Sequence, residues 1–162
     1  MSAVLVVASM AVWLASGVRL GIIDCRTGLL PTRIIWPTAG VVAVLLCAAS
    51  LVEGDPVRLA HAAVGAAICG AILAAIHFIH PPSMGFGDVR LSVLNGLLCG
   101  WWGWQAALVG LAGGFVLAFP EAVVVLARHG LRTSRPLGPY LLGGTAAVVA
   151  WAAVTQGLIP AR

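Results

Sequence analysis

The sequence predicts an all-α membrane protein, a polytopic bundle of six transmembrane helices. Hydrophobic residues make up 61% of the 162-residue chain and charged residues only 9%, whereas about a quarter of the residues of a soluble domain are charged. The mean hydropathy is +1.07. Backbone polar groups inside a bilayer must be hydrogen-bonded within the protein, and long apolar runs achieve this as helices. We therefore expect a single membrane domain over residues 1–162, with no room for a sizeable soluble domain.

Six apolar runs define the expected helices. The first covers residues 3–18 and is expected to end near Ile23. No positive charge precedes it and another apolar run follows at once, so we interpret it as a retained helix rather than a signal peptide. The other runs predict helices over Ile34–Val52, Leu59–Ile79, Asp88–Leu98, Gln105–Ala127 and Pro139–Leu158.

Local signals set the boundaries of these runs. Pro31 and Arg33 precede the second helix, and the turn-forming stretch "EGDP" ends it. The third helix stops before "HPPSMG", because two prolines remove amide donors and the glycine admits irregular backbone. The short turn "GWWGW" separates the fourth helix from the fifth, and a basic segment separates the fifth from the last.

The arginines predict the orientation of the bundle. If both termini lie outside, only Arg58 and Arg162 of the nine arginines remain outside, which is the bias that the positive-inside rule describes. The seven arginines on the cytoplasmic side are then Arg19, Arg26, Arg33, Arg90, Arg128, Arg132 and Arg135. This orientation places the segments 24–33, 80–88 and 128–138 at the cytoplasmic face of the inner membrane. An aromatic belt at the opposite interface is expected from Trp101, Trp102 and Trp104.

The composition also bounds the partners. The net charge is only +4, and no run of basic residues with interleaved aromatics is present to follow a phosphate backbone, so no nucleic-acid partner is expected. The four cysteines form no CxxC or Cys/His pair with metal-ligand spacing, so neither a metal nor another cofactor is expected. The lipid bilayer is the expected environment, and a homodimer stays open.

Asp24 and Asp88 are the polar residues that most need explanation, because an ionisable group at membrane depth is costly and faces a partner, the bundle interior or a water-filled cavity. Asp88 alone could cap a helix N-terminus, and this alternative stays open. Two carboxylates in a poorly solvated site share a proton, so the ionised one can activate a water while the protonated one polarises a carbonyl. Gly85 and Gly87 would let an extended peptide approach Asp88 without a Cβ clash.

Three segments, in order along the chain, resemble motifs of the type IV prepilin peptidases. "GFGDVRL" resembles the GxGD-x-K/R-L motif, "DCRTGLLPTR" is similar to the first-aspartate motif, and "RPLGPYLLGG" resembles the Pro-x-Gly-Pro segment that opens the last helix. Leu30 and Thr32 replace the Ile and Asn common around Pro31, and Arg90 stands where Lys is frequent. The likeness covers nearly the whole chain.

The resemblance implies a GxGD intramembrane aspartyl protease that removes the short basic leader of prepilins and pseudopilins at the cytoplasmic membrane face. Its catalytic residues would be Asp24 and Asp88. Motif or backbone support is implied for Gly85, Gly87, Arg90, Thr27 and Pro31, and a substrate-contacting or last-helix role for Pro136, Gly138 and Pro139. The bifunctional members carry an N-terminal cytoplasmic zinc and methyltransferase domain with paired CxxC motifs, which is missing here. We therefore expect the short, peptidase-only form associated with tight-adherence (Flp) pili, without N-methyltransferase activity.

Two other functions fit the same acids. A small proton-coupled transporter could use them as a proton relay, but it predicts inverted repeats, and the sequence has no convincing internal repeat. A non-catalytic assembly factor of a pilus or secretion machine would need neither acid. Glu121, after Pro120, could pair with a polar neighbour or face a cavity, and we expect a structural or snorkelling role. His77 and His80 border the loop that leads into "GFGD" and could contact substrate or lipid phosphate, but we expect them to be solvated near the interface.

Overall fold

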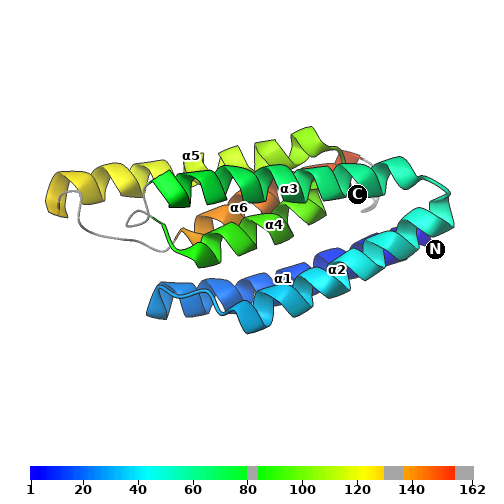
Figure 1. Ribbon diagram of the computed structural model, residues 1–162, viewed down its shortest axis with the longest axis horizontal. Helices are drawn as coiled ribbons and strands as arrows, with labels where there is room; N and C mark the ends of the chain where they lie inside the picture. The colour runs from blue at the N-terminus through cyan, green and yellow to red at the C-terminus, as the bar shows by residue number, and fades with distance from the viewer. Residues whose placement is uncertain (80–83, 130–136, 156–162) are drawn as a thin grey trace.

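The computed structural model describes residues 1–79, 84–129 and 137–155, and for residues 124–129 it describes the backbone alone. In these residues the secondary structure consists of six α-helices (Figure 1). The helices are α1 (Ser2–Thr27), α2 (Thr32–Glu53), α3 (Pro56–Ile79), α4 (Phe86–Gly100), α5 (Trp104–His129) and α6 (Gly138–Thr155). Five of them are long and apolar enough to cross a membrane. The exception is α4, whose 15 residues fall short of the roughly 20 that a span requires. The predicted all-α membrane fold is confirmed.

The largest difference from the predicted helix boundaries concerns α1. It continues to Thr27, beyond the predicted end near Ile23, so Asp24 lies within the last helical turn and not after the helix. The helix ends at Gly28, whose φ of 62° lies in the left-handed region and whose N–H donates to the Asp24 carbonyl oxygen at 2.8 Å. A residue without Cβ adopts this conformation at little cost, so Gly28 accounts for the position of the helix end.

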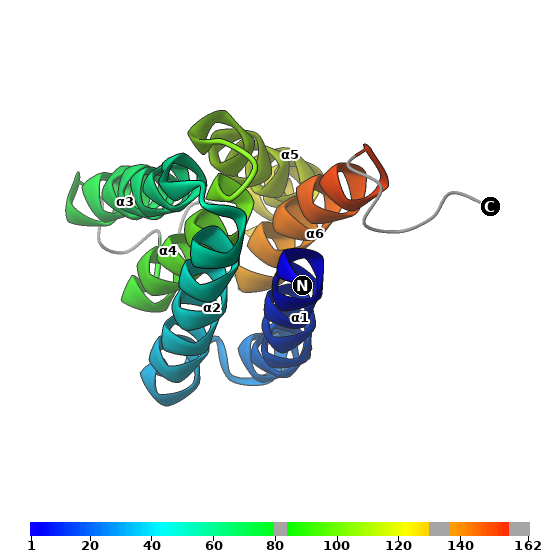
Figure 2. The same cartoon turned by 90° about the vertical axis from the view of Figure 1, so that its right-hand side faces the viewer.

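The short helix α4 lies inside the bundle. It packs against α2, α3, α5 and α6, and Figure 2, which looks along the helices, shows α4 and α6 between the pair α1 and α2 and the pair α3 and α5. Ten of the 15 residues of α4 are buried. This explains how a helix too short to span a bilayer is stable in this protein, because other helices cover most of its surface.

Glycines permit the closest approaches between helices. A Cβ on Gly96 of α4 would lie 2.5 Å from the carbonyl oxygen of Gly65 in α3, and a Cβ on Gly100 would lie 2.7 Å from the Cα of Ala62. Between α5 and α6, a Cβ on Gly114 would lie 3.0 Å from the Cα of Leu141. Small residues at helical intervals allow membrane helices to pack by close backbone contact.

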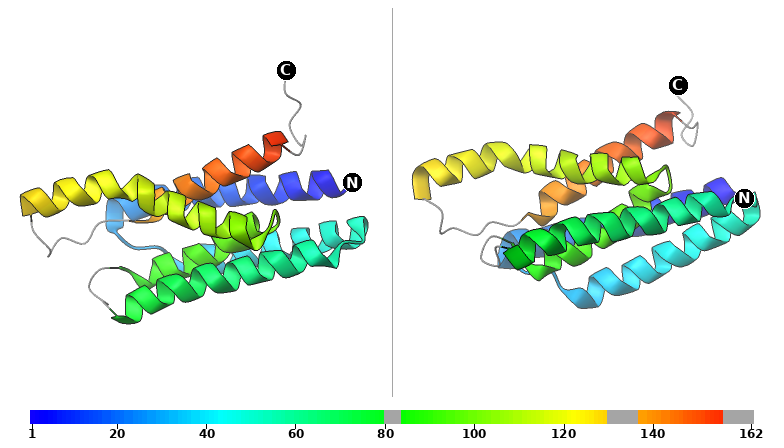
Figure 3. Two further views of the ribbon diagram at one scale, coloured as in Figure 1. Left: turned by 90° about the horizontal axis from the view of Figure 1, so that it is seen from above. Right: turned by 45° about the horizontal axis from the view of Figure 1, so that its top comes forward.

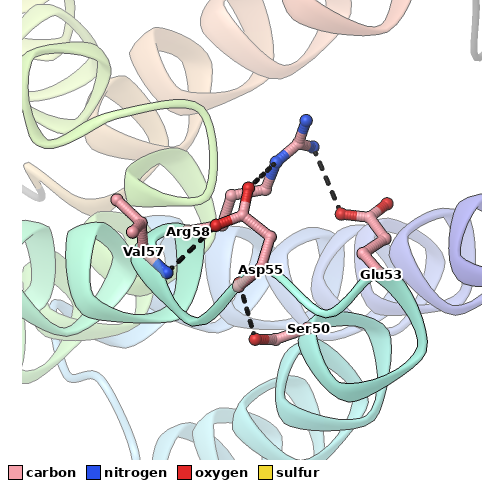
Figure 4. Close-up of polar contacts among 5 residues, drawn as sticks. All are labelled: Ser50, Glu53, Asp55, Val57 and Arg58. Atoms are coloured by element: carbon pink, nitrogen blue, oxygen red, sulfur yellow. Dashed lines mark hydrogen bonds and ion pairs between the residues drawn. The ribbon is translucent and has the colours of Figure 1, made fainter.

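A charged cluster closes the turn between α2 and α3 (Figure 4). The Arg58 guanidinium lies 3.3 Å from Oδ2 of Asp55 and 3.6 Å from Oε2 of Glu53. It also lies 5.8 Å from the ring centroid of Trp101. Trp101 is only 2% exposed, so the expectation that it belongs to a lipid-facing aromatic belt is wrong for this residue, because the bundle encloses its ring. Trp104, at 37%, is exposed.

The opposite end of the bundle collects the candidate functional residues. There α1, α3 and α5 end while α2, α4 and α6 begin, toward the left of both Figure 1 and Figure 3. The N-terminus and the end of α6 lie at the other end. Since successive helices run in opposite directions, the ends of three helices and the starts of three others meet in one layer, which brings together segments that are far apart in the sequence.

Candidate active site

Asp24 points from the last turn of α1 into the bundle, where it is 3% exposed. Its Oδ2 accepts a hydrogen bond of 3.0 Å from the backbone N–H of Gly138, the first residue of α6. The first amides of a helix have no partner within the helix and carry a partial positive charge. The Asp24 carboxyl group therefore caps the N-terminus of α6, whose first residue lies 114 residues further along the chain.

Asp88 lies in the first turn of α4 and is 7% exposed. Gly85 precedes the helix in an extended conformation, and its carbonyl oxygen accepts the Asp88 N–H at 3.1 Å. The Asp88 carboxyl group interacts in turn with the backbone amide of Gly85, which is the contact expected of an acid at the third position of a helix. Its Oδ1 is buried without a hydrogen-bond partner among the described residues. Asp88 thus contributes to capping and still presents an unused polar atom.

Leu30 joins the surroundings of the two acids. A Cβ added to Gly87, next to Asp88, would lie 2.6 Å from the Leu30 Cβ, and a Cβ added to Gly138 would lie 3.5 Å from the Leu30 Cδ1. The two carboxyl groups are also near enough to interact electrostatically. The structure therefore places Asp24 and Asp88 at one site, with the connection between α1 and α2 packed against both of their supporting glycines.

Arg90 connects the start of α4 to the start of α2. Its guanidinium donates to the Thr32 hydroxyl and lies 4.7 Å from the ring centroid of Phe86. Pro31 is the N-cap residue of α2 in an extended conformation, and its carbonyl oxygen accepts the Ile34 N–H at 3.0 Å. These contacts place the segment that carries Leu30, so Arg90 and Pro31 act on the site through the backbone around them.

Thr27 contacts backbone groups near the end of its own helix. Its hydroxyl donates to the Ile23 carbonyl oxygen at 2.8 Å within α1, and the residue is exposed. Hydroxyl groups commonly bond the carbonyl of the preceding helical turn in this way. The contacts of Thr27 are therefore those of a helix end.

The start of α6 is held from two sides. Gly138 is buried against Asp24, and Tyr140, two residues later, donates its hydroxyl to the carboxylate of Glu121 in α5. The interpretation that Glu121 pairs with a polar neighbour is confirmed. Pro139 is the second residue of α6. Pro136 lies outside the described residues.

His77 is engaged with the segment that leads into α4, and is not simply solvated. One ring nitrogen lies 2.9 Å from the Met84 carbonyl oxygen, and the ring meets that of Phe86 edge to face at a centroid distance of 5.4 Å. His77 is therefore a structural support for the residues just before Asp88. His80 lies outside the described residues.

Sequence reasoning missed the roles of Leu30 and Tyr140. Leu30 was visible only as a departure from the motif, because nothing in its sequence context distinguishes it from other apolar residues. Tyr140 offered a signal, since it is the only tyrosine of the chain and adjoins Pro139 in an otherwise apolar segment. A half-buried phenol needs a partner for its hydroxyl group, and Glu121 is the acid that the sequence of α5 supplies.

Two buried carboxyl groups in one site can perform acid and base chemistry together. Asp24 accepts a backbone N–H, Asp88 has an oxygen with no hydrogen-bond partner among the described residues, and apolar and glycine residues lie next to both. Because the site is shielded from water and its dielectric constant is low, the electrostatic interactions of the two carboxyl groups with a polar group of a bound peptide are stronger than in water.

Comparison with known proteins gives one family that the chain matches. The model of the type IV leader peptidase family matches residues 8–156, which is most of the chain. No curated protein and no solved structure matches the chain.

Proposed function

Because this chain belongs to the type IV leader peptidase family, whose members are aspartic endopeptidases that process the leaders of type IV prepilins, we propose that Asp24 and Asp88 are its catalytic pair. The observation that carries the proposal is the burial of both acids at one site, with the Asp24 carboxyl group bonded to the start of α6. The chemistry requires no other side chain.

The hydrogen bonds suggest a role for each acid. Asp24 accepts the Gly138 N–H at the positive end of α6, an arrangement that stabilises a carboxylate, so Asp24 is the base that takes a proton from the attacking water. Asp88 also receives a backbone amide, that of Gly85, but its buried Oδ1 has no hydrogen-bond donor among the described residues. A buried oxygen without a donor costs less when the carboxyl group is protonated, so Asp88 is the acid that hydrogen-bonds to the scissile carbonyl oxygen. Water attacks the carbonyl carbon, the C–N bond breaks, and the leaving amine takes up the proton.

We place this reaction at the cytoplasmic membrane face. The site lies at the end of the bundle that carries Arg26 and Arg33, both exposed, and Arg90. Cytoplasmic loops carry an excess of arginine. The substrate is then a prepilin or pseudopilin whose basic leader stays in the cytoplasm and whose hydrophobic helix lies in the bilayer beside the protein, which brings the bond between them to the depth of the two acids.

The direct test is leader removal by purified protein in lipid nanodiscs. The substrate is a Flp-type prepilin with a basic leader and a glycine before its apolar helix, and the product is identified by gel shift and by the mass of its new N-terminus. Asp24→Asn and Asp88→Asn should each lower the cleavage rate by about 10²- to 10⁴-fold, since each removes a proton-transfer group while preserving the size of the side chain.

Asp55→Asn is the matched control, because Asp55 is an acid in the Arg58 cluster at the opposite end of the bundle. It should cleave at the parent rate. Parent-like cleavage by either Asp24→Asn or Asp88→Asn would show that the catalytic assignment is wrong. Loss of a pH-dependent ion flux with the same variants, in place of lost cleavage, would identify a proton-coupled transporter.

A further inference from the structure

A buried amide joins three helices beyond the two acids. The Nε1–H of Trp13 in α1 donates to Oδ1 of Asn95 in α4 at 2.9 Å. The Nδ2–H of Asn95 donates in turn to the carbonyl oxygen of Leu141 in α6 at 3.3 Å. All three residues are buried, Asn95 at 7% exposure. We call Trp13, Asn95 and the Leu141 carbonyl the amide bridge.

The amide bridge determines the register of the helices. A buried donor or acceptor without a partner is costly, because no water replaces the lost hydrogen bond. If α1 shifted along α4 by one residue, both the indole N–H and the amide oxygen would lose their partners. Apolar contacts in a membrane protein allow many registers of similar energy, so a directional polar contact selects one of them.

Each member of the amide bridge is rigidly connected to a part of the active site through its own helix. Asn95 lies about two helical turns after Asp88 on the same face of α4, and Trp13 lies about three turns before Asp24 on the same face of α1. Leu141 lies about one turn after Gly138, whose N–H bonds Asp24. The three helices that the bridge joins are therefore the three that supply the two acids and the amide donor.

We propose that Asn95 is a positioning residue for peptide cleavage, which holds α1 and α6 in register with α4 so that Asp24 meets Asp88 across the scissile bond. Asn95 does not touch the substrate, and its effect reaches the site only through the helix backbones. This inference rests on the proposed function, because it assumes that both acids act on one bond.

Ser92 provides a matched control in the same helix. It is also buried and polar, one turn from Asn95, but its hydroxyl donates to the carbonyl oxygens of Val89 in its own helix and Cys69 in α3. It contacts neither α1 nor α6 by a described hydrogen bond. A general loss of polar packing in α4 would affect Ser92→Ala and Asn95→Leu alike, whereas loss of register would affect only Asn95→Leu.

The first arm of the test is steady-state cleavage of a Flp-type prepilin in nanodiscs. Asn95→Leu should lower kcat by about 10- to 100-fold with KM changed by less than about 2-fold, since a shift of about 1 Å in catalytic groups costs up to about 10²-fold in rate. Trp13→Phe removes the indole N–H together with the five-membered part of the ring, keeps an aromatic ring in the core, and should lower kcat in the same direction. The double variant should match Asn95→Leu, because Asn95→Leu already breaks the Trp13–Asn95 hydrogen bond that Trp13→Phe removes. Ser92→Ala should keep the parent kcat.

The second arm measures the register directly and needs no activity. Spin labels are attached at Arg26 of α1 and Phe78 of α3, both exposed, after the exposed Cys25 and Cys47 are replaced by Ser. Because α3 packs closely on α4, the distance between the labels reports the position of α1 relative to α4. Double electron–electron resonance should give a broader or shifted distribution for Asn95→Leu and for Trp13→Phe, and an unchanged one for Ser92→Ala.

The outcomes separate the inference from the proposed function. Parent-like kcat and parent-like distances in Asn95→Leu would overturn the positioning role, and so would equal losses in Ser92→Ala. If Asn95→Leu does not fold, the milder Trp13→Phe decides by the same two measurements. A failure of the proposed function appears elsewhere, as cleavage that persists in Asp24→Asn or Asp88→Asn, and the distance measurement on the amide bridge remains valid in that case.

Discussion

The N–H of Gly138 donates a hydrogen bond to Oδ2 of Asp24 at 3.0 Å, and this contact joins the start of α6 to the end of α1. It leaves no room for a side chain, since a Cβ on Gly138 would lie 2.6 Å from Oδ2 and 3.2 Å from Cγ of Asp24. The glycine therefore does more than open the last helix. It sets how closely a backbone amide approaches the acid that we propose as the base.

Gly138→Ala tests this relationship. The added methyl group must displace the Asp24 carboxyl group or the start of α6, so the rate of leader cleavage should fall by about 10- to 100-fold while the protein stays folded. Gly143→Ala in the same helix is the control, because its Cβ would meet only the flexible end of Leu117 at 3.1 Å. Equal cleavage rates for the two variants would contradict the importance of the Gly138 amide.

Gly87→Ala should lower activity by a different route. Its Cβ would lie 2.6 Å from the Leu30 Cβ and 3.4 Å from the Leu30 carbonyl oxygen, contacts that no rotation of the Leu30 side chain relieves. The connection between α1 and α2 must then move away from Asp88. Leu30→Gly removes the opposing Cβ, so the double variant should recover part of the lost cleavage rate. If it recovers none, the clash with Leu30 is not the cause of the defect.

Gly96→Ala should lower stability, because its Cβ would lie 2.5 Å from the Gly65 carbonyl oxygen and 3.0 Å from the Cα of Ala66, both backbone atoms. Overpacking of this kind costs about 1–3 kcal/mol. With Cys25 and Cys47 replaced by Ser, a thiol-reactive dye reports exposure of the buried Cys69 and Cys99 on heating.

The melting temperature of Gly96→Ala should fall below that of the parent. Gly40→Ala in α2 is the control, because no atom lies within 4 Å of its added Cβ, and alanine favours helix over glycine. Its melting temperature should be unchanged or higher. A parent-like melting temperature for Gly96→Ala would show that α3 and α4 separate at little cost.

The proposed orientation predicts which ends of the helices a membrane-impermeant maleimide reaches in intact cells. A single cysteine at Leu29, in the connection between α1 and α2, should react only after the inner membrane is permeabilised. A single cysteine at Val57, beside the Arg58 cluster, should react in intact cells, because we place that end outside. Both positions are exposed, so accessibility within the protein does not separate them. The reverse labelling pattern would place the two acids outside the cytoplasm.

Much of the fold follows from the sequence because insertion in a membrane leaves few options. Apolar runs must be helical in a bilayer, and prolines, glycines and charges separate them, so all six helices could be placed before any contact was known. The predicted end of α1, near Ile23, was wrong by about one turn, because the helix continues through polar residues until Gly28 ends it. The shortness of α4 was visible in the sequence, but not that other helices surround it.

The candidate site, like the fold, could be predicted only in part from the sequence. Asp24 and Asp88 could be singled out from the sequence because a carboxyl group next to apolar segments is unusual. The other motif residues were identified by the resemblance of their segments to the family motifs. Leu30, the amide bridge and the bond between Tyr140 and Glu121 could not, since they depend on contacts between residues far apart in the chain. Trp101 shows the same limit, because its buried position was not visible from its place in a turn.

What the sequence by itself determined is which segments enter the membrane and which residues there are too polar to be ordinary. What only the tertiary structure decided is which faces of the helices meet. The physical reason is that lipid tails are as apolar as a protein core, so a lipid-facing leucine and a buried leucine look alike in the sequence. Asn95 and Trp13 form a contact across 82 residues, and only the packed bundle reveals that the amide and the indole share one hydrogen bond.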